Sequence, residues 1–108
     1  MAANTVDSKI VKMLRREIEN GATPSQAGRA TLRAYGSMRH SDLIRYYVMA
    51  FSVWNAAFLN ALFFWEPRDE KTPEGIDDAE FDRRVTPMID EKRALWNAGS
   101  SRGQVVSR

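Results

Sequence analysis

The chain has 108 residues, of which 44% are hydrophobic and 28% are charged, and this is the composition of one globular domain. Sixteen Lys and Arg against 14 Asp and Glu give a net charge of +2, which excludes a strongly basic nucleic-acid coat protein and an acidic mimic of nucleic acid. The absence of Cys excludes disulfides, thiolate metal sites and a Cys nucleophile, and a single His excludes a His-based metal cage within one subunit.

The first helix is predicted near the start of the chain. Apolar residues at helical spacing between Ile10 and Ile18 indicate a helix that begins at about Thr5 or Asp7 and ends at Glu19. Asn20-Gly21 follows, and Gly adopts the left-handed conformation that commonly ends a helix.

A second helix is predicted to start directly afterwards. Thr23 has the side chain of an N-cap, Pro24 fits the first helical position, and Gln26 completes a capping box. This helix is expected to run to Tyr35 and to stop at Gly36. Its small residues, which allow a close approach to a neighbouring element, are Ala27, Gly28, Ala30 and Ala34.

The third predicted helix dominates the sequence. Tyr46 to Trp65 is a run of twenty residues without a charged side chain, and Pro67 ends any helix that contains this run. We therefore expect one long apolar helix over residues 39–65. Its polar positions form a stripe of about 80° of arc, made of Arg45, Ser52, Asn55 and Glu66.

Two shorter helices are predicted in the rest of the chain. Residues 66–76 have the Pro, Gly and charge content of a linker, and residues 77–80 have the sequence of a helix start. Because Pro inside a helix costs about 3 kcal/mol, this helix is expected to break or kink at Thr86-Pro87. A last helix is then predicted from Pro87 to Asn97.

The predicted fold is all-α. We expect a small bundle of four to five helices around the long central helix of residues 39–65. Residues 1–98 would form a single helical domain, and residues 99–108 have the Gly, Ser and Arg content of a flexible tail.

The apolar helix has two competing interpretations. As a single membrane span over residues 46–65, with the N-terminus inside, it would rise about 30 Å. The amides of Asn55 and Asn60 oppose insertion into hydrocarbon, which favours a helix that forms the core of a soluble bundle or a homo-oligomer interface. The residues expected to form this core or self-association face are Phe51, Trp54, Asn55, Ala57, Phe58, Leu59, Ala61 and Leu62.

Nucleic-acid binding is an alternative function. Residues 24–47 have the spacing of a helix-turn-helix, and residues 1–54 carry eight basic against four acidic side chains, a net charge of +4. Against this alternative, the second helix of the motif continues into the apolar run, and the whole chain has a low net charge. The residues expected to contact nucleic acid or another anionic partner are Arg29, Arg33, Arg39, His40 and Arg45.

Catalysis has little support in the sequence. His40 is followed by Ser41 and Asp42, but adjacent residues of a helix do not face each other. The carboxylates of residues 77–82 lack the spacing of a calcium loop. We therefore expect no catalytic residue, metal, cofactor or small-molecule substrate.

The sequence favours a non-enzymatic interaction or assembly protein. It would form a homo-oligomer through its apolar helix and dock a macromolecular partner. The absence of an apolar signal segment within residues 1–14 favours a cytoplasmic location. A helix-turn-helix regulator and a single-span membrane subunit are the alternatives.

Overall fold

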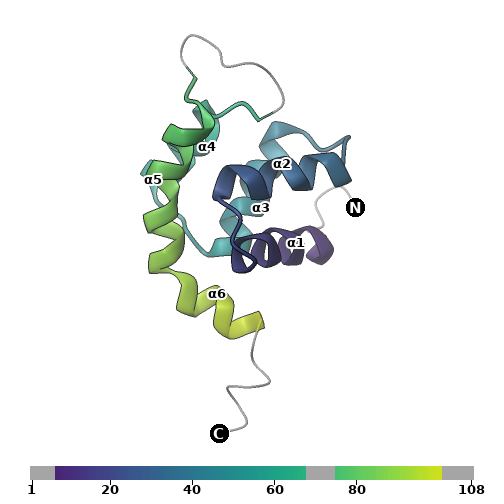
Figure 1. Cartoon of the computed structure of the whole chain (residues 1–108), viewed down its shortest axis with the longest axis vertical. Coiled ribbons are helices and arrows are strands. Elements are labelled where there is room, and N and C mark those ends of the chain that lie inside the picture. The colour runs from purple at the N-terminus through teal and green to yellow at the C-terminus, as the bar shows by residue number, and fades with distance from the viewer. Residues whose placement is uncertain (1–6, 68–74, 101–108) are drawn as a thin grey trace, which may run out of the picture.

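The computed structural model describes residues 7–67 and 75–100, and the fold of this part of the chain is all-α, as predicted. The described helices number six rather than four to five: α1 (Ser8–Glu19), α2 (Pro24–Ala34), α3 (His40–Phe51), α4 (Ala56–Phe64), α5 (Asp78–Glu91) and α6 (Arg93–Ser100). Helix α1 packs against α2 and α3, while α5 runs along the other side of the molecule and contacts α2 and α4 (Figure 1). Helix α6 follows the far end of α5 and packs back against α3.

Local caps fix both ends of α1 and the start of α2, and those at Gly21 and Thr23 are the ones that the sequence predicts. The Asp7 side chain caps α1 by accepting a hydrogen bond from the Lys9 amide at 2.9 Å. Gly21 has a φ of +99° beyond the end of α1, and the amides that follow the helix donate to its last carbonyls in a Schellman motif. At the start of α2, Thr23 and Gln26 exchange the two hydrogen bonds of a capping box.

The single long helix predicted over residues 39–65 is wrong, because α3 and α4 take its place. Ser52 ends α3 in the left-handed conformation, with a φ of 58° and a ψ of 40°. Asn55 then caps α4, and its side-chain oxygen accepts from the Phe58 amide at 2.8 Å. Ser52 and Asn55 therefore mark the two sides of a break instead of belonging to a polar stripe.

The break buries apolar surface that a straight helix would leave uncovered. A helix over residues 39–65 would be about 40 Å long, which is more than the remaining short helices can enclose. Folding back brings Phe58, Leu62 and Trp65 into the same core as Phe51, and all four are at most 1% exposed. His40, at the start of α3, links α3 to α4, because its Nε2 donates to the Leu62 carbonyl at 2.9 Å.

The sequence predicts a break or a kink at Pro87, and the break is wrong. Helix α5 continues through Pro87, and the chain turns at Lys92 instead, just before α6. Burial of one continuous face offsets the cost of a Pro inside the helix. This face consists of Phe81, Val85 and Ile89.

Aromatic side chains form the centre of the core. The Tyr47 ring lies edge-on to the rings of Phe51, Trp65 and Phe81, with centroids 5.9 to 6.1 Å apart. The rings of Trp65 and Phe81 stack at 3.9 Å. The Tyr47 hydroxyl donates to the Pro24 carbonyl at 2.5 Å, and burial raises the pKa of Tyr47 well above its usual range. One neutral tyrosine thus joins α2, α3, α5 and the end of α4.

Three further sequence predictions concern the C-terminal tail, the linker and the membrane span. Gly99 and Ser100 end α6 rather than begin the predicted tail, and residues 101–108 lie outside the described residues, as do residues 68–74 of the predicted linker. The span predicted over residues 46–65 is divided between α3 and α4. Within residues 7–67 and 75–100, no helix combines the length and the apolar content needed to cross a bilayer.

Candidate interaction surface

Helix α4 is apolar except for one residue. Its nine residues include no charged side chain, and Asn60 is the single polar one. The inward face, made of Phe58, Ala61 and Leu62, is buried in the core. Helices that are apolar on every side are normally enclosed by protein, but the outward face of α4 has no described element over it.

The outward face carries exposed aromatic side chains. Trp54, which precedes the α4 cap, is 74% exposed, Phe63 is 65% exposed, and Phe64 and Leu59 are 41% and 36% exposed. The rings of Phe63 and Phe64 lie edge-to-face, with centroids 5.2 Å apart. Trp54 precedes the Asn55 cap, and Leu59 is the fourth residue of α4. Apolar residues at these two positions commonly contact each other at the start of a helix. We define the apolar surface of α4 as Trp54, Ala56, Ala57, Leu59, Asn60, Phe63 and Phe64, all exposed.

The apolar surface of α4 contains no charge of its own. The charged residues nearest to it in sequence are Arg45 and Glu66. The Glu66 carboxylate lies 3.5 Å from His40 Nδ1, at the junction of α3 with the end of α4. Large exposed apolar patches are uncommon on globular proteins and are often sites of interaction with proteins or membranes.

The residues predicted to form the core or the self-association face separate into two groups. Four lie in the protein's own core, and they are Phe51, Phe58, Ala61 and Leu62. The other four are exposed, and they are Trp54, Asn55, Ala57 and Leu59. Sequence reasoning missed Phe63 and Phe64. Phe63 comes four residues after Leu59, so the two side chains lie on the same side of a helix. This relation could have indicated Phe63 if the helix had been predicted to start at the Asn55 cap.

Most of the basic residues predicted to contact an anion are engaged within the protein. Asp42 lies between Arg39 and Arg45, with carboxylate oxygens 3.7 and 3.9 Å from the two guanidinium groups. His40 contacts the Leu62 carbonyl, and Arg33 lies exposed on α2. Helix α3, the second helix of the predicted helix-turn-helix, buries six of its twelve residues, so its exposed face is narrow.

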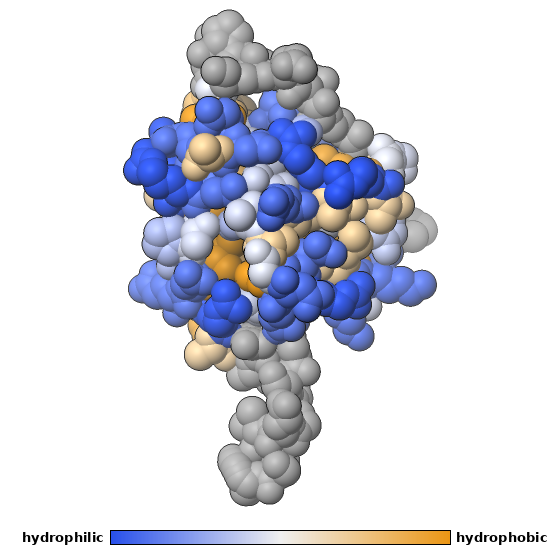
Figure 2. All heavy atoms as spheres, viewed as in Figure 1, coloured by the Kyte–Doolittle hydropathy of each residue, from blue (hydrophilic) through white to orange (hydrophobic). Residues whose placement is uncertain are grey.

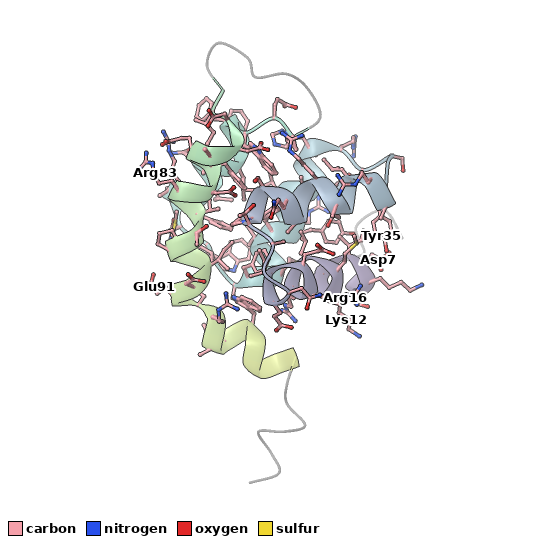
Figure 3. The ribbon with its side chains drawn as sticks, viewed as in Figure 1. Asp7, Lys12, Arg16, Tyr35, Arg83 and Glu91 are labelled. Carbon is pink, nitrogen blue, oxygen red and sulfur yellow. The ribbon has the colours of Figure 1, made fainter. Side chains whose placement is uncertain are left out.

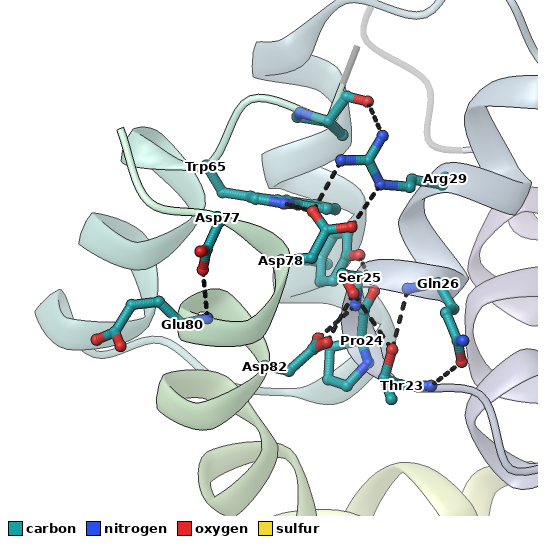
Figure 4. A network of polar contacts seen from close by, with 12 residues as sticks. Thr23, Pro24, Ser25, Gln26, Arg29, Trp65, Asp77, Asp78, Glu80 and Asp82 are labelled. Atoms are coloured by element: carbon teal, nitrogen blue, oxygen red, sulfur yellow. Dashed lines mark hydrogen bonds and ion pairs between the residues drawn. The ribbon is translucent and has the colours of Figure 1, made fainter. Parts of the chain in front are cut away.

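Arg29, the remaining basic residue predicted to contact an anion, is part of a polar network (Figure 4). Its Nε and Nη2 donate to the two carboxylate oxygens of Asp78 at 2.9 and 2.7 Å, and its Nη1 donates to the Pro67 carbonyl at 2.6 Å. The Trp65 indole also donates to Asp78, at 2.9 Å. Hydrogen bonds from Arg29 hold the pKa of Asp78 below its usual range, although burial opposes them.

The same network fixes the two ends of the connection between α4 and α5. Arg29 binds Pro67 at one end and Asp78 at the other. The Ile76 amide donates to the Phe64 carbonyl at 3.0 Å, in a bridge beside Trp65. The chain therefore leaves α4 and enters α5 at neighbouring points.

Ser25 and Asp82 form the second half of the network. The Asp82 carboxylate accepts from the amide and the hydroxyl of Ser25, both at 2.7 Å, and so caps α2 from α5. Ser25 is 2% exposed, which keeps its hydroxyl away from any substrate in solution. The single His of the chain is hydrogen-bonded at the α3–α4 junction and not to Ser25. The Ser25–Asp82 pair therefore has the geometry of a structural contact.

The rest of the described surface is largely polar. Lys12 and Arg16 on α1 and Arg83 and Glu91 on α5 point outward (Figure 3). A hollow of about 270 Å³ between the α1–α2 connection and α5 has an apolar floor (Figure 2). Its lining includes Ile18, Ala22, Pro24 and Ile89. In the described ranges, no three His, Asp or Glu side chains are grouped closely enough to hold a metal ion.

Comparisons of the chain with protein-family models, curated proteins and solved structures give no match. The apolar surface of α4 is the described feature that best fits a functional role, because both its exposure and its lack of charge are unusual for a helix packed on a core.

Proposed function

We propose that the chain is a non-enzymatic helical interaction protein that binds another protein through the apolar surface of α4. The observation that carries this proposal is the exposure of Trp54, just before α4, and of Phe63, within α4, on a helix that has no charged residue. Aromatic residues are enriched in protein interfaces, and Trp is prominent among the residues that contribute most to binding. The absence of Cys fits a cytoplasmic location, which is part of the proposal.

The exposed rings are a source of binding free energy. Burying the exposed part of a Trp or Phe side chain is worth about 2 to 4 kcal/mol. Covering both Trp54 and Phe63 therefore changes an equilibrium constant by several powers of ten before the entropic cost of association is subtracted. A partner that left either ring uncovered would lose a large part of this gain.

Photo-crosslinking in the source cells tests the proposal. A photoreactive phenylalanine analogue at position 54 is expected to form covalent adducts with protein, and Phe63→Ser in the same chain should remove them. The matched control places the analogue at Leu95, which is 63% exposed on α6, at the opposite end of α5 from α4. Adducts from position 54 that are no more abundant than those from position 95 would overturn the proposal.

A helix-turn-helix function over residues 24–47 is the second candidate, and exposed Arg33 is the observation in its favour. Binding to duplex DNA through phosphate contacts would weaken steeply with salt. Arg33→Ala and Arg45→Ala would each weaken it further. Absence of binding at low salt ends this alternative.

A further inference from the structure

We infer that the partner on the apolar surface of α4 is a second copy of this chain, bound through two antiparallel α4 helices about a two-fold axis at Asn60. The inference rests on the proposed function and names its partner. Three observations support it, namely the pattern of large and small residues, the absence of charge and the exposed area.

Large and small residues of the α4 surface are complementary to each other. Asn60 lies at the centre of the exposed face, with Ala56 and Ala57 one turn before it and Phe63 and Phe64 one turn after it. In an antiparallel pair centred on Asn60, positions before the axis meet positions after it. Phe63 of one copy then lies over Ala56 of the other, and Phe64 lies over Ala57.

The position of Asn60 is also compatible with a two-fold axis. At the axis this side chain meets its own counterpart, and an amide has both donors and an acceptor to offer to an identical amide. The single polar residue of α4 would thus be satisfied in the interface, whereas a wholly apolar partner would leave it without a hydrogen bond.

The absence of charge favours a second copy over a charged partner. A two-fold interface brings the same surface of each copy together, so every charge near the axis would face its own sign. The apolar surface of α4 avoids this repulsion, because no residue from Tyr46 to Trp65 is charged. It offers no ion pair to a partner with a charged binding face.

The exposed area suits a modest but specific dimer. The rings of Trp54, Phe63 and Phe64 alone expose roughly 300 to 450 Å² in each copy. Two copies, together with Leu59 and the alanines, would bury about 1,000 Å² in total, which is the lower limit for a specific interface. We therefore expect a dimer that dissociates on dilution.

Sedimentation equilibrium of the purified full chain tests the inference. The expected result is a monomer–dimer equilibrium that Ala57→Trp weakens at least tenfold, because the new ring occupies the space for Phe64 of the other copy. Ala79→Trp is the matched control, since Ala57 and Ala79 are both exposed and both second in their helices. Circular dichroism verifies that each variant is folded.

Asn60→Asp is a second variant that keeps the size of the side chain. It places two like charges at the axis, so dimerisation should weaken at least tenfold at pH 7 and recover as the pH is lowered towards the carboxyl pKa. A dimer that neither Ala57→Trp nor Asn60→Asp weakens would overturn the inference.

The outcomes separate this inference from the proposed function. A chain that stays monomeric at millimolar concentration, yet forms adducts with a different protein from position 54, overturns the second copy and keeps the proposed function. A monomeric chain without adducts overturns both. Binding to phosphatidylcholine vesicles that Trp54→Ser abolishes, with no dimer in solution, would assign the surface to a membrane and overturn both as well.

Discussion

At Gly28, helix α2 approaches the core more closely than a larger residue permits. A Cβ at this position would collide with the Tyr47 hydroxyl and lie 2.8 Å from Trp65 Cη2. Gly28→Ala is therefore expected to destabilise the protein by about 1 to 3 kcal/mol, although Ala is the better helix former by about 1 kcal/mol. Urea unfolding followed by circular dichroism measures the change.

Gly36→Ala is the control for this prediction. A Cβ at Gly36 would meet only the Leu32 carbonyl, at 3.9 Å, which is an ordinary contact distance. This variant is expected to have the stability of the wild type or to gain up to about 1 kcal/mol. Equal losses at the two positions would contradict the close approach at Gly28.

Asp78 gives a prediction about pH. Its pKa is lowered in the folded protein, so its contribution to stability is present above the pKa of the unfolded chain and is lost as the pH falls through the folded value. Asp78→Asn is expected to cost about 1 kcal/mol at pH 7, a modest value because the side chain is 43% exposed. Thermal unfolding between pH 7 and pH 3 should show this cost shrinking below about pH 4.

Exposed Glu91 on α5 serves for comparison. Glu91→Gln is expected to leave the stability within about 0.5 kcal/mol of the wild type over the same pH range. A cost of Asp78→Asn that stays constant from pH 7 to pH 3 would show that the carboxylate charge is not what stabilises the network.

At the scale of elements, the break between α3 and α4 depends on the cap of the second helix. Asn55→Ala removes the oxygen that accepts from the Phe58 amide, and it is expected to cost about 1 kcal/mol in chemical unfolding. Asn55→Asp retains an acceptor and should restore most of this loss. If Asn55→Asp is as destabilising as Asn55→Ala, the cap is not what fixes the start of α4.

The elements also show what could be predicted from the sequence. The end of α1 and the start of α2 depend on Gly21 and the capping box, which act locally, and both were predicted. The start of α1 was placed only at about Thr5 or Asp7. The break at Ser52 was missed because Ser rarely adopts a positive φ and the Asn55 cap lies inside an apolar run. Pro87 was given too much weight because burial of the α5 face depends on contacts distant in sequence.

The same reasoning applies to the candidate site. The uncharged run from Tyr46 to Trp65 located the apolar helix but not its exposed face. That Phe63 is exposed and Leu62 is buried depends on where α5 covers α4, and α5 comes later in the chain. Local sequence therefore predicted the region of the surface and could not select its residues.

At the scale of the whole molecule, charged and apolar surfaces occupy different places. Charged side chains point outward from α1 and α5, while the apolar surface of α4 has none (Figure 3). Dimerisation through α4 should therefore change less than about threefold between low and high sodium chloride, because screening acts on charges. Sulfate should strengthen it.

Sedimentation at about 0.05 and 0.5 M sodium chloride measures this dependence. Association between the basic first half and the acidic second half of two chains would behave in the opposite way, because each salt increment would weaken it. A loss of affinity of tenfold or more at the higher salt concentration would thus identify charge, and not the aromatic rings, as the basis of association.

The contacts of Arg29 with Pro67 and Asp78 also bear on how the length of this protein can vary. Because contacts of Arg29 and Ile76 hold the exit from α4 beside the entry into α5, we expect the helices to keep their positions when residues are added between Pro67 and Gly75. Doubling such a connection costs only about 0.6 kcal/mol of chain entropy. We therefore expect that a tag or a second domain can be inserted here while the helical core and the α4 surface stay intact.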